Sequence, residues 1–255
     1  MLKITETEVF GWRASIRGMR NPLESWDKSD SDFSSDLAKE MSPESEYHLG
    51  PNDLALMKKL VAAGTDHSKF MRMIHVQCDW EAPLYWWKEA DTYKVGTVRN
   101  SCSTMHKITD KEFTLDDFTH EHLIDYSLYY CDAVEEPVIN GAPHVGCGGL
   151  QLLNLTINVL NYYREKYLVA LKTEEECGIS AKEIWWQLIQ LLPSSYLQKA
   201  TMDLNYATLR NMYHSRKYHK QDEWRKDFCN WVKTLPYSEL ITMTKEELLE
   251  SIKEE

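Results

Sequence analysis

The stretch from Ala82 to Met105, APLYWWKEADTYKVGTVRNSCSTM, decides how this chain is interpreted. Its first half is aromatic and begins with Pro83, which suits the first turn of a helix because no intrahelical partner awaits an N–H there. Its second half is a short loop that gathers hydroxyls, an amide, a thiol and the cations Lys94 and Arg99. Unneeded buried polar groups are costly to retain. The stretch therefore indicates a buried helix that ends in a binding loop.

Composition indicates a globular protein. The 255 residues are 43% hydrophobic and 27% charged, and 40 acidic against 29 basic residues give a net charge of -11. Such a surface repels phosphate backbones, so no duplex nucleic acid is expected as a partner, although a local basic pocket can hold one nucleotide. The start of the chain lacks the apolar core of a signal peptide, and no run approaches the ~20 apolar residues of a membrane span. We expect no membrane partner.

The six cysteines, Cys78, Cys102, Cys131, Cys147, Cys177 and Cys229, are scattered and form no CxxC pair. Together with the missing export signal, this spacing predicts reduced thiols and a cytoplasmic protein.

Periodicity predicts a mainly helical α+β domain that covers residues 1–255. The Ser/Asp/Glu-rich residues 24–50 predict a flexible loop, and residues 242–255 a polar C-terminal tail with a helix capped by Thr244 and Glu247. Alternation over 70–80 predicts a strand. Helices are predicted over 53–63 with Asn52 as cap, 151–171, 184–192 after a capping box of Ser180 and Glu183, 202–217 and 222–233. The helix 151–171 is apolar nearly all round, which places it at the centre of the core.

Three local patterns have a chemical and an ordinary interpretation. The two histidines of Thr119-His120-Glu121-His122 lack a third ligand nearby, so a solvated turn is favoured over a metal site. The backbone amides of the loop 143–149, PHVGCGG, could cradle a phosphate. The loop lacks the Lys-Ser/Thr ending of a P-loop, so an ordinary loop before the long helix is favoured. Cys102 and His106 are four residues apart, and in a helix they would form a reactive thiol–imidazole pair, although a small polar side chain near a loop is favoured.

Asn205 and Arg216 form the more specific pattern. They are eleven residues apart, almost three helical turns, so one helix would project both from one face. An amide and a guanidinium on one face can grip a planar, anionic heterocycle, while ordinary ion pairs on a solvated face are the alternative.

These segments together resemble the flavin-dependent thymidylate synthases, which methylate dUMP with a folate and a reduced flavin. The resemblance runs with gaps from Ile16 to Trp231. IRGMRNPLESWD resembles the early arginine segment of the family, and NDLALMKKLVAAGTDHSKF the helix before its Gly-His turn. LPSSYLQKATMDLNYATLRNMYHSRKYHK resembles its C-terminal Asn-x-Arg-Ser-Leu...Arg segment without a gap from Pro193 to Arg216.

The opening stretch overlays the family's signature Arg-His-Arg-x-x-Ser-x-Asn-Glu-x-Ser, with departures. Thr92, Tyr93 and Lys94 stand in the place of Arg-His-Arg, and Glu89 stands where a substrate-binding glutamine is usual. Ala207 replaces a flavin-side arginine. A cation replaced by Thr or Ala loses a charge-assisted contact of roughly 1.5–3 kcal/mol.

The resemblance implies the fold, the ligands and the roles of named residues. The fold would be a mixed α+β domain with several long helices around a small antiparallel sheet, normally a homotetramer with sites between subunits. FAD would be the cofactor, NADPH and methylene-tetrahydrofolate the co-substrates, and a phage or bacterial source is expected. Arg216 would polarise the pyrimidine as the catalytic residue. Substrate-binding residues would be Glu89, Lys94, Thr97, Arg99, Cys102, Ser103 and Lys199, and cofactor-binding residues His67, Tyr93, Asn100, Asn205 and Asn211.

Three hypotheses follow. The first is a divergent enzyme that methylates a pyrimidine nucleotide. The second is a protein without catalysis, whose remodelled pocket sequesters a nucleotide or a nucleotide-derived signal. The third is a structural oligomer with a relic pocket, which the dense polar loop argues against.

Overall fold

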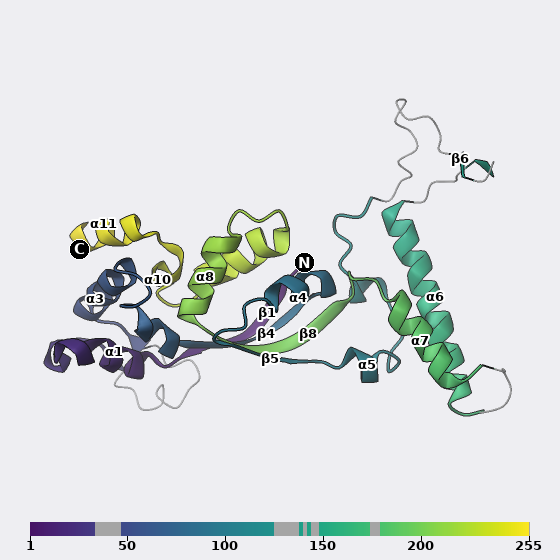
Figure 1. Cartoon of the computed structure of the whole chain (residues 1–255), viewed down its shortest axis with the longest axis horizontal. Helices are drawn as coiled ribbons and strands as arrows, with labels where there is room; N and C mark the ends of the chain where they lie inside the picture. The colour runs from purple at the N-terminus through teal and green to yellow at the C-terminus, as the bar shows by residue number, and fades with distance from the viewer. Residues whose placement is uncertain (34–46, 125–137, 140–141, 144–147, 174–178, 255) are drawn as a thin grey trace. The chain divides into compact units, whose positions relative to one another are not determined.

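A computed structural model describes residues 1–33, 47–124, 138–139, 142–143, 148–173 and 179–254 (Figure 1). They divide into two compact units, one of residues 1–81, 86–101 and 199–255 and the other of 82–85 and 102–198. The single domain expected over residues 1–255 stays a prediction. No helix among these residues is long and apolar enough to cross a membrane.

The first unit is built on a small four-stranded antiparallel sheet, as predicted. The strand order is β1-β4-β8-β5, with β1 at Lys3–Phe10, β4 at His75–Pro83, β5 at Thr97–Ser101 and β8 at Leu197–Asn205. Strand β8 pairs with β5 in the register Asn100↔Thr201. Helices α4 (Leu84–Ala90) and α8 (Tyr206–Arg216) lie over one face of the sheet in Figure 1.

Alternation along β4 and β8 separates the two faces of the sheet. Val76, Cys78 and Trp80 are buried on β4, while the residues between them are at least partly exposed. Ala200, Met202 and Leu204 are buried on β8 in the same way. Successive side chains of a strand point to opposite faces, so one face packs under the helices and the other is polar.

Two sequence predictions in this region are wrong in their boundaries. The strand predicted over 70–80 begins only at His75, because 69–73 (Lys69–Met73) forms a short 3-10 helix. The helix predicted over 202–217 is a strand up to Asn205 and a helix only from Tyr206. The alternating burial of Met202 and Leu204 is a strand pattern that a helical assignment overlooked.

An aromatic cluster fills the space between the sheet and the helices. Trp80 lies at its centre, with ring centroids of its neighbours 5.4 to 6.1 Å away, mostly edge to face. Edge-to-face contacts of this kind add to the stabilisation from burial alone. The members are Trp80, Trp86, Trp87, Trp224, Phe228 and Trp231.

A buried ion pair joins α1 (Trp12–Arg20) to α3 (Pro51–Ala62). Arg20 donates from Nε to Asp53 Oδ1 at 2.6 Å, and the side chains are only 4% and 0% exposed. Helix α3 matches the predicted helix, but its N-cap is Gly50 and not Asn52. The carboxylate of Asp30 accepts from the backbone N–H groups of Asn52 and Asp53 instead, and so satisfies donors of the first turn.

Part of the predicted flexible loop 24–50 is described. Two 3-10 helices, Asn21–Leu23 and Trp26–Lys28, lead to the paired strands β2 (Asp32–Phe33) and β3 (Tyr47–His48). Residues 34–46 lie outside the described residues.

The C-terminal region of the first unit is helical. A π-helix (Glu223–Phe228) leads into α9 (Cys229–Lys233), followed by α10 (Glu239–Thr242) and α11 (Lys245–Glu254). Thr244 and Glu247 cap α11 reciprocally, as predicted. The buried Leu248 anchors this tail.

The second unit is a helical hairpin with its own core. Helix α6 (Gly149–Ala170) packs on α7 (Ala181–Leu191), which begins with the predicted capping box of Ser180 and Glu183. Its shorter elements are α5 (Thr104–Lys107), a 3-10 turn (Leu115–Asp117), β6 (Val138–Ile139) and β7 (Ala142–Pro143). The core consists of Ile108, Phe113, Phe118, Leu153, Ile157, Leu160 and Leu188.

The prediction that the helix 151–171 is surrounded by core is wrong for one of its faces. Leu153, Ile157 and Leu160 are buried, but an outer row of apolar side chains is 48% to 57% exposed within the described structure. That row comprises Leu152, Leu155, Tyr162 and Val169.

Candidate functional site

The candidate site is centred on Arg216, in the last turn of α8. Its Nη1 donates to Glu89 Oε2 at 2.6 Å, and its Nε donates to the phenolic oxygen of Tyr93 at 2.8 Å. Glu89 comes from the end of α4, and Tyr93 from the turn that follows. The Arg216 side chain is 18% exposed, so the guanidinium is oriented by the protein and still reaches solvent.

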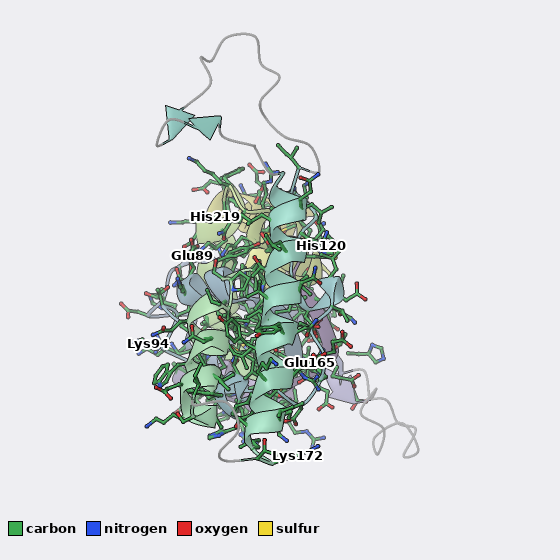
Figure 2. The ribbon with its side chains drawn as sticks, turned by 90° about the vertical axis from the view of Figure 1, so that its right-hand side faces the viewer. Glu89, Lys94, His120, Glu165, Lys172 and His219 are labelled. Carbon is green, nitrogen blue, oxygen red and sulfur yellow. The ribbon has the colours of Figure 1, made fainter. Side chains whose placement is uncertain are left out.

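His219 completes a three-residue cluster, which we call the Arg216 cluster (Glu89, Arg216 and His219). Its Nδ1 accepts from the backbone N–H of Gln221 at 3.2 Å, so in the neutral ring the proton lies on Nε2. Nε2 is 3.3 Å from Glu89 Oε2. Figure 2 labels Glu89 and His219, which lie side by side. The Glu89 carboxylate is therefore held by two donors from the end of α8 and the segment after it.

Aromatic rings form the wall beneath the guanidinium. The Arg216 carbon Cζ lies 4.9 Å from the centroid of Trp224 and 5.4 Å from that of Tyr93. Trp224 belongs to the π-helix, is fully buried and stacks on Trp86 at 4.5 Å. A cation over an aromatic face is stabilised by the ring quadrupole, and π-helical turns recur at functional sites.

The turn between Tyr93 and Thr97 is fixed by the start of α8. Asn205 caps α8 by accepting from the backbone N–H of Thr208, and its Nδ2 donates to the carbonyl of Gly96. Thr208 Oγ1 donates to the carbonyl of Val95 at 3.0 Å. Asn205 thus precedes the helix that carries Arg216, and both side chains reach the segment 89–97 from α4 to β5.

Gly96 has a positive φ of 75°, and a Cβ there would come within 2.3 Å of Asn205 Nδ2. The turn therefore requires glycine for conformation and for space.

The guanidinium of Arg99 contacts a carboxylate and an aromatic ring. Its Nη1 lies 2.8 and 2.7 Å from the two carboxylate oxygens of Asp91, and its Cζ lies 3.8 Å from the Trp87 ring. Arg99 lies on the same face of the sheet as the aromatic cluster.

Lys199 and Asn100 lie on the other face of the sheet. Lys199 Nζ is 2.9 Å from Asp79 Oδ2, and Thr201 donates to Asp79 Oδ1 at 2.6 Å. These hydrogen bonds from Thr201 and Lys199 hold the pKa of Asp79 below its ordinary value. Asn100 is directly opposite Thr201 in the register. The residues predicted to hold one nucleotide are thus divided between two faces of one sheet.

The remaining predicted residues lie apart or have local roles. Lys94 is exposed and makes no hydrogen bond or ion pair within the described part of the chain (Figure 2). Thr97 donates its hydroxyl to the Tyr93 carbonyl. His67 lies exposed in the turn after α3, and Asn211 is exposed on α8.

The predicted thiol–imidazole pair is not assembled on one helix. Cys102 precedes α5, and Ser103 is the N-cap of α5, where it accepts from the backbone N–H of His106. Cys102 is exposed, whereas burial raises the pKa of the Cys78 thiol to about 12 and also raises that of Cys229. Cys131, Cys147 and Cys177 lie outside the described residues.

The other two patterns give no site in the described structure. Residues 121–122 of the two-histidine motif form a turn, and His120 Nδ1 lies 2.9 Å from the Phe118 carbonyl. No group of three or more potential metal ligands gathers among the described residues. Most of the loop 143–149 falls at 144–147, outside those residues.

The predicted flavin contacts are only partly available in one chain. The Tyr93 hydroxyl and the Asn205 amide are engaged in hydrogen bonds, and Asn100 faces away from Tyr93 across the sheet. Besides Asn100, only His67 and Asn211 are exposed with side chains that make no hydrogen bond within the described residues. Two such side chains do not fit a flavin by themselves, so no reaction step is assigned to one.

The structure brings together three of the predicted site residues, Glu89, Tyr93 and Arg216, and adds His219 and Trp224, which the sequence analysis did not name. A histidine three residues after the key arginine, in a run of cations, was the available signal for His219. Trp224 gave no such signal, because one tryptophan among nine looks like core.

Solved structures share this fold. Two are of the flavin-dependent thymidylate synthase ThyX from Helicobacter pylori, both with FAD and dUMP. One aligns with a TM-score of 0.57 at 12% identity over 100% of each chain. The other aligns with a TM-score of 0.55 at 12% identity over 93% of this chain and 96% of the other. A UMP/dUMP methylase, PolB from Streptomyces cacaoi, aligns with a TM-score of 0.49 at 12% identity over 98% and 94%.

No family model and no curated protein matches the sequence. The similarity to ThyX confirms the predicted fold.

Proposed function

We propose that this chain, which has the fold of the flavin-dependent thymidylate synthases, binds a pyrimidine nucleotide at Arg216 and methylates it reductively. The proposed substrate is dUMP, with methylene-tetrahydrofolate as the carbon donor and FAD and NADPH as the redox partners. The ThyX structures with the same fold hold FAD and dUMP, which supports this choice.

The orientation of Arg216 is the observation that carries the proposal. Two of its N–H groups are used by Glu89 and Tyr93, and the guanidinium keeps further donors at a partly exposed position. A hydrogen-bond donor that the protein already holds in place can polarise a carbonyl of the pyrimidine ring. It can also stabilise the negative charge that develops on the ring as its carbon C5 attacks the one-carbon unit to be transferred. Tyr93, the partly exposed ring of the aromatic wall, supplies a flat surface for the ring.

The phosphate of the nucleotide would be held by cations on the two faces of the sheet. Lys94 comes directly after Tyr93, which contacts Arg216, while Lys199 pairs with Asp79 on the face of the sheet opposite Arg99, and this separation argues against one phosphate contacting both cations of one chain. A site formed between copies of the chain removes this conflict. We therefore propose a homo-oligomer, and a homotetramer in particular.

Helix α6 offers the surface for such an assembly. Leu152, Leu155, Val159, Tyr162, Lys166 and Val169 recur at alternating steps of three and four residues. This spacing is that of a helix–helix seam, and four of the six are exposed apolar side chains. The compartment we propose is the cytoplasm, where the scattered cysteines would stay reduced.

An absorption spectrum of the purified protein tests the flavin, and a dUMP titration followed by tryptophan fluorescence tests the nucleotide. A yellow protein that takes up FAD, binds dUMP and releases tritium from 5-labelled dUMP is the expected result. A colourless protein without FAD uptake and without tritium release would exclude the enzyme.

A second function is favoured by the same contacts. Glu89 neutralises Arg216, and the predicted flavin contacts Tyr93 and Asn205 are engaged within the chain. These features support a protein that sequesters a nucleotide, or a nucleotide-derived signal, without catalysis. Native mass spectrometry would then show a co-purified nucleotide on a protein that lacks flavin.

A further inference from the structure

We propose that Glu89 is a specificity-determining residue. Its carboxylate excludes phosphate and other anions from Arg216 and reserves the guanidinium for a neutral ring edge that carries an N–H beside a C=O. This inference rests on the proposed nucleotide site and says which part of the ligand Arg216 contacts.

The first step is the state of Glu89. Oε2 accepts from Arg216 Nη1 at 2.6 Å and lies 3.3 Å from His219 Nε2, which carries the proton because Nδ1 accepts from a backbone N–H. These two contacts hold the oxygen in place. Glu89 is thus a negative charge fixed beside the guanidinium.

The second step is the part of the pair that stays open. The Glu89 side chain is 35% exposed, and its Oε1 has no partner in the described residues. Arg216 uses Nε and Nη1, which leaves Nη2 without a partner in the same residues. The two groups are joined by the 2.6 Å contact between Oε2 and Nη1, so the pair offers one acceptor and one donor to a ligand, and the complement is a lactam such as the N3–H and C=O of a uracil ring.

The predicted cations of the site differ in whether an acid lies beside them. Arg99 is matched by Asp91, and Lys199 by Asp79. An anion that approaches Arg216 meets the repulsion of Glu89, which offsets the attraction of the guanidinium. Lys94 carries no such neighbour among the described residues, so an anion meets less repulsion there than at Arg216, and the ring belongs at Arg216.

The test compares the wild-type chain with E89Q, which keeps the size of the side chain and removes its charge. The matched control is D110N, which removes the same charge from an exposed carboxylate that contacts Lys107 and none of the predicted site residues. Each protein is titrated with inorganic phosphate, deoxyuridine and dUMP. Binding is followed by the fluorescence of the tryptophan cluster next to Arg216 and by calorimetry, after thermal unfolding has shown that each variant is folded.

We expect E89Q to change the affinities for the two small ligands, inorganic phosphate and deoxyuridine, in opposite directions. It should bind inorganic phosphate at least tenfold more tightly than wild type and deoxyuridine at least tenfold more weakly, while D110N resembles wild type. A general loss of packing would weaken both ligands. Should E89Q fail to fold, E89A serves in the phosphate titration, with the same increase expected.

The outcomes separate this inference from the proposed function. If wild type binds dUMP but E89Q shows unchanged or parallel effects on phosphate and deoxyuridine, the role of Glu89 is wrong and the nucleotide site stands. If no protein binds dUMP or deoxyuridine, the nucleotide site itself is wrong, and the inference with it.

Discussion

At the scale of single residues, cations of this chain are recurrently matched by acids. Arg216 meets Glu89, Arg99 meets Asp91, and Arg20 meets Asp53. The three pairs differ in burial, and burial decides what a pair does. An exposed pair adds little to stability, whereas breaking a buried pair leaves a charge without compensation. The same chemistry therefore orients a partly exposed guanidinium at Glu89 and joins two helices in the interior at Asp53.

The Asp53→Asn variant tests the buried pair. Asp53 Oδ2 also accepts from the hydroxyls of Ser29 and Ser31, at 2.7 and 2.6 Å, so the substitution disrupts a network as well as a pair. We expect a loss of about 3–5 kcal/mol in the free energy of unfolding, because Arg20 stays buried without its counter-ion. Urea denaturation at neutral pH measures this. D110N, in the exposed pair with Lys107, should cost less than about 1 kcal/mol.

The pH dependence of stability follows from the same carboxylate. Burial raises the pKa of Asp53, but the hydrogen bonds from Ser31, Ser29 and Arg20 outweigh it and hold the pKa below its usual value. A depressed pKa in the folded state contributes stability that is fully present above the unfolded pKa of about 3.9 and is lost as pH falls through the folded value. The difference between wild type and D53N should therefore shrink in melts below about pH 4. An equal difference at pH 7 and pH 3 would contradict this assignment.

At the scale of elements, the sequence predicted helices better than the transition from β8 to α8. Asn205 is an N-cap residue, and three alternating apolar residues precede it, so the boundary was encoded in the chain. The helical periodicity of Tyr206, Leu209 and Met212 extended the assignment too far back. Which face of β8 carries Lys199 could not be predicted, because a face is defined only once the strand and its register are known.

Substitution of Gly96 tests the turn that joins α4 to β5. In Gly96→Ala, the new Cβ clashes with Asn205 Nδ2, and the alanine must also adopt a backbone conformation with a positive φ. Strain in the left-handed region costs about 1–2 kcal/mol, and loss of the Asn205 cap adds about 1 kcal/mol. Gly64 has a φ of 108° and nothing within 4 Å of a Cβ, so G64A reports the strain alone. Thermal melts should rank G96A below G64A, and equal melts would show that the Asn205 contact is dispensable.

At the scale of the whole molecule, the outer row of α6 predicts association. Leu155→Glu places a charge in the middle of that row, where a partner helix would have to bury it. We expect the assembly to dissociate towards smaller species in light scattering coupled to size exclusion. L249E, at an exposed leucine on α11, is the control and should keep the wild-type mass. A monomeric wild-type protein at micromolar concentration would contradict the assembly.

The division of Lys199 and Arg216 between opposite faces of one sheet has a genetic consequence. If a working site takes Arg216 from one copy and Lys199 from another, two chains that each fail alone can complement each other. R216A and K199A chains that are unfolded and refolded together would form mixed assemblies. Some sites of these assemblies would carry both substitutions, and other sites would carry neither. Activity or nucleotide binding would then reappear in the mixture, and two alleles with no function apart would rescue one another within a single cell.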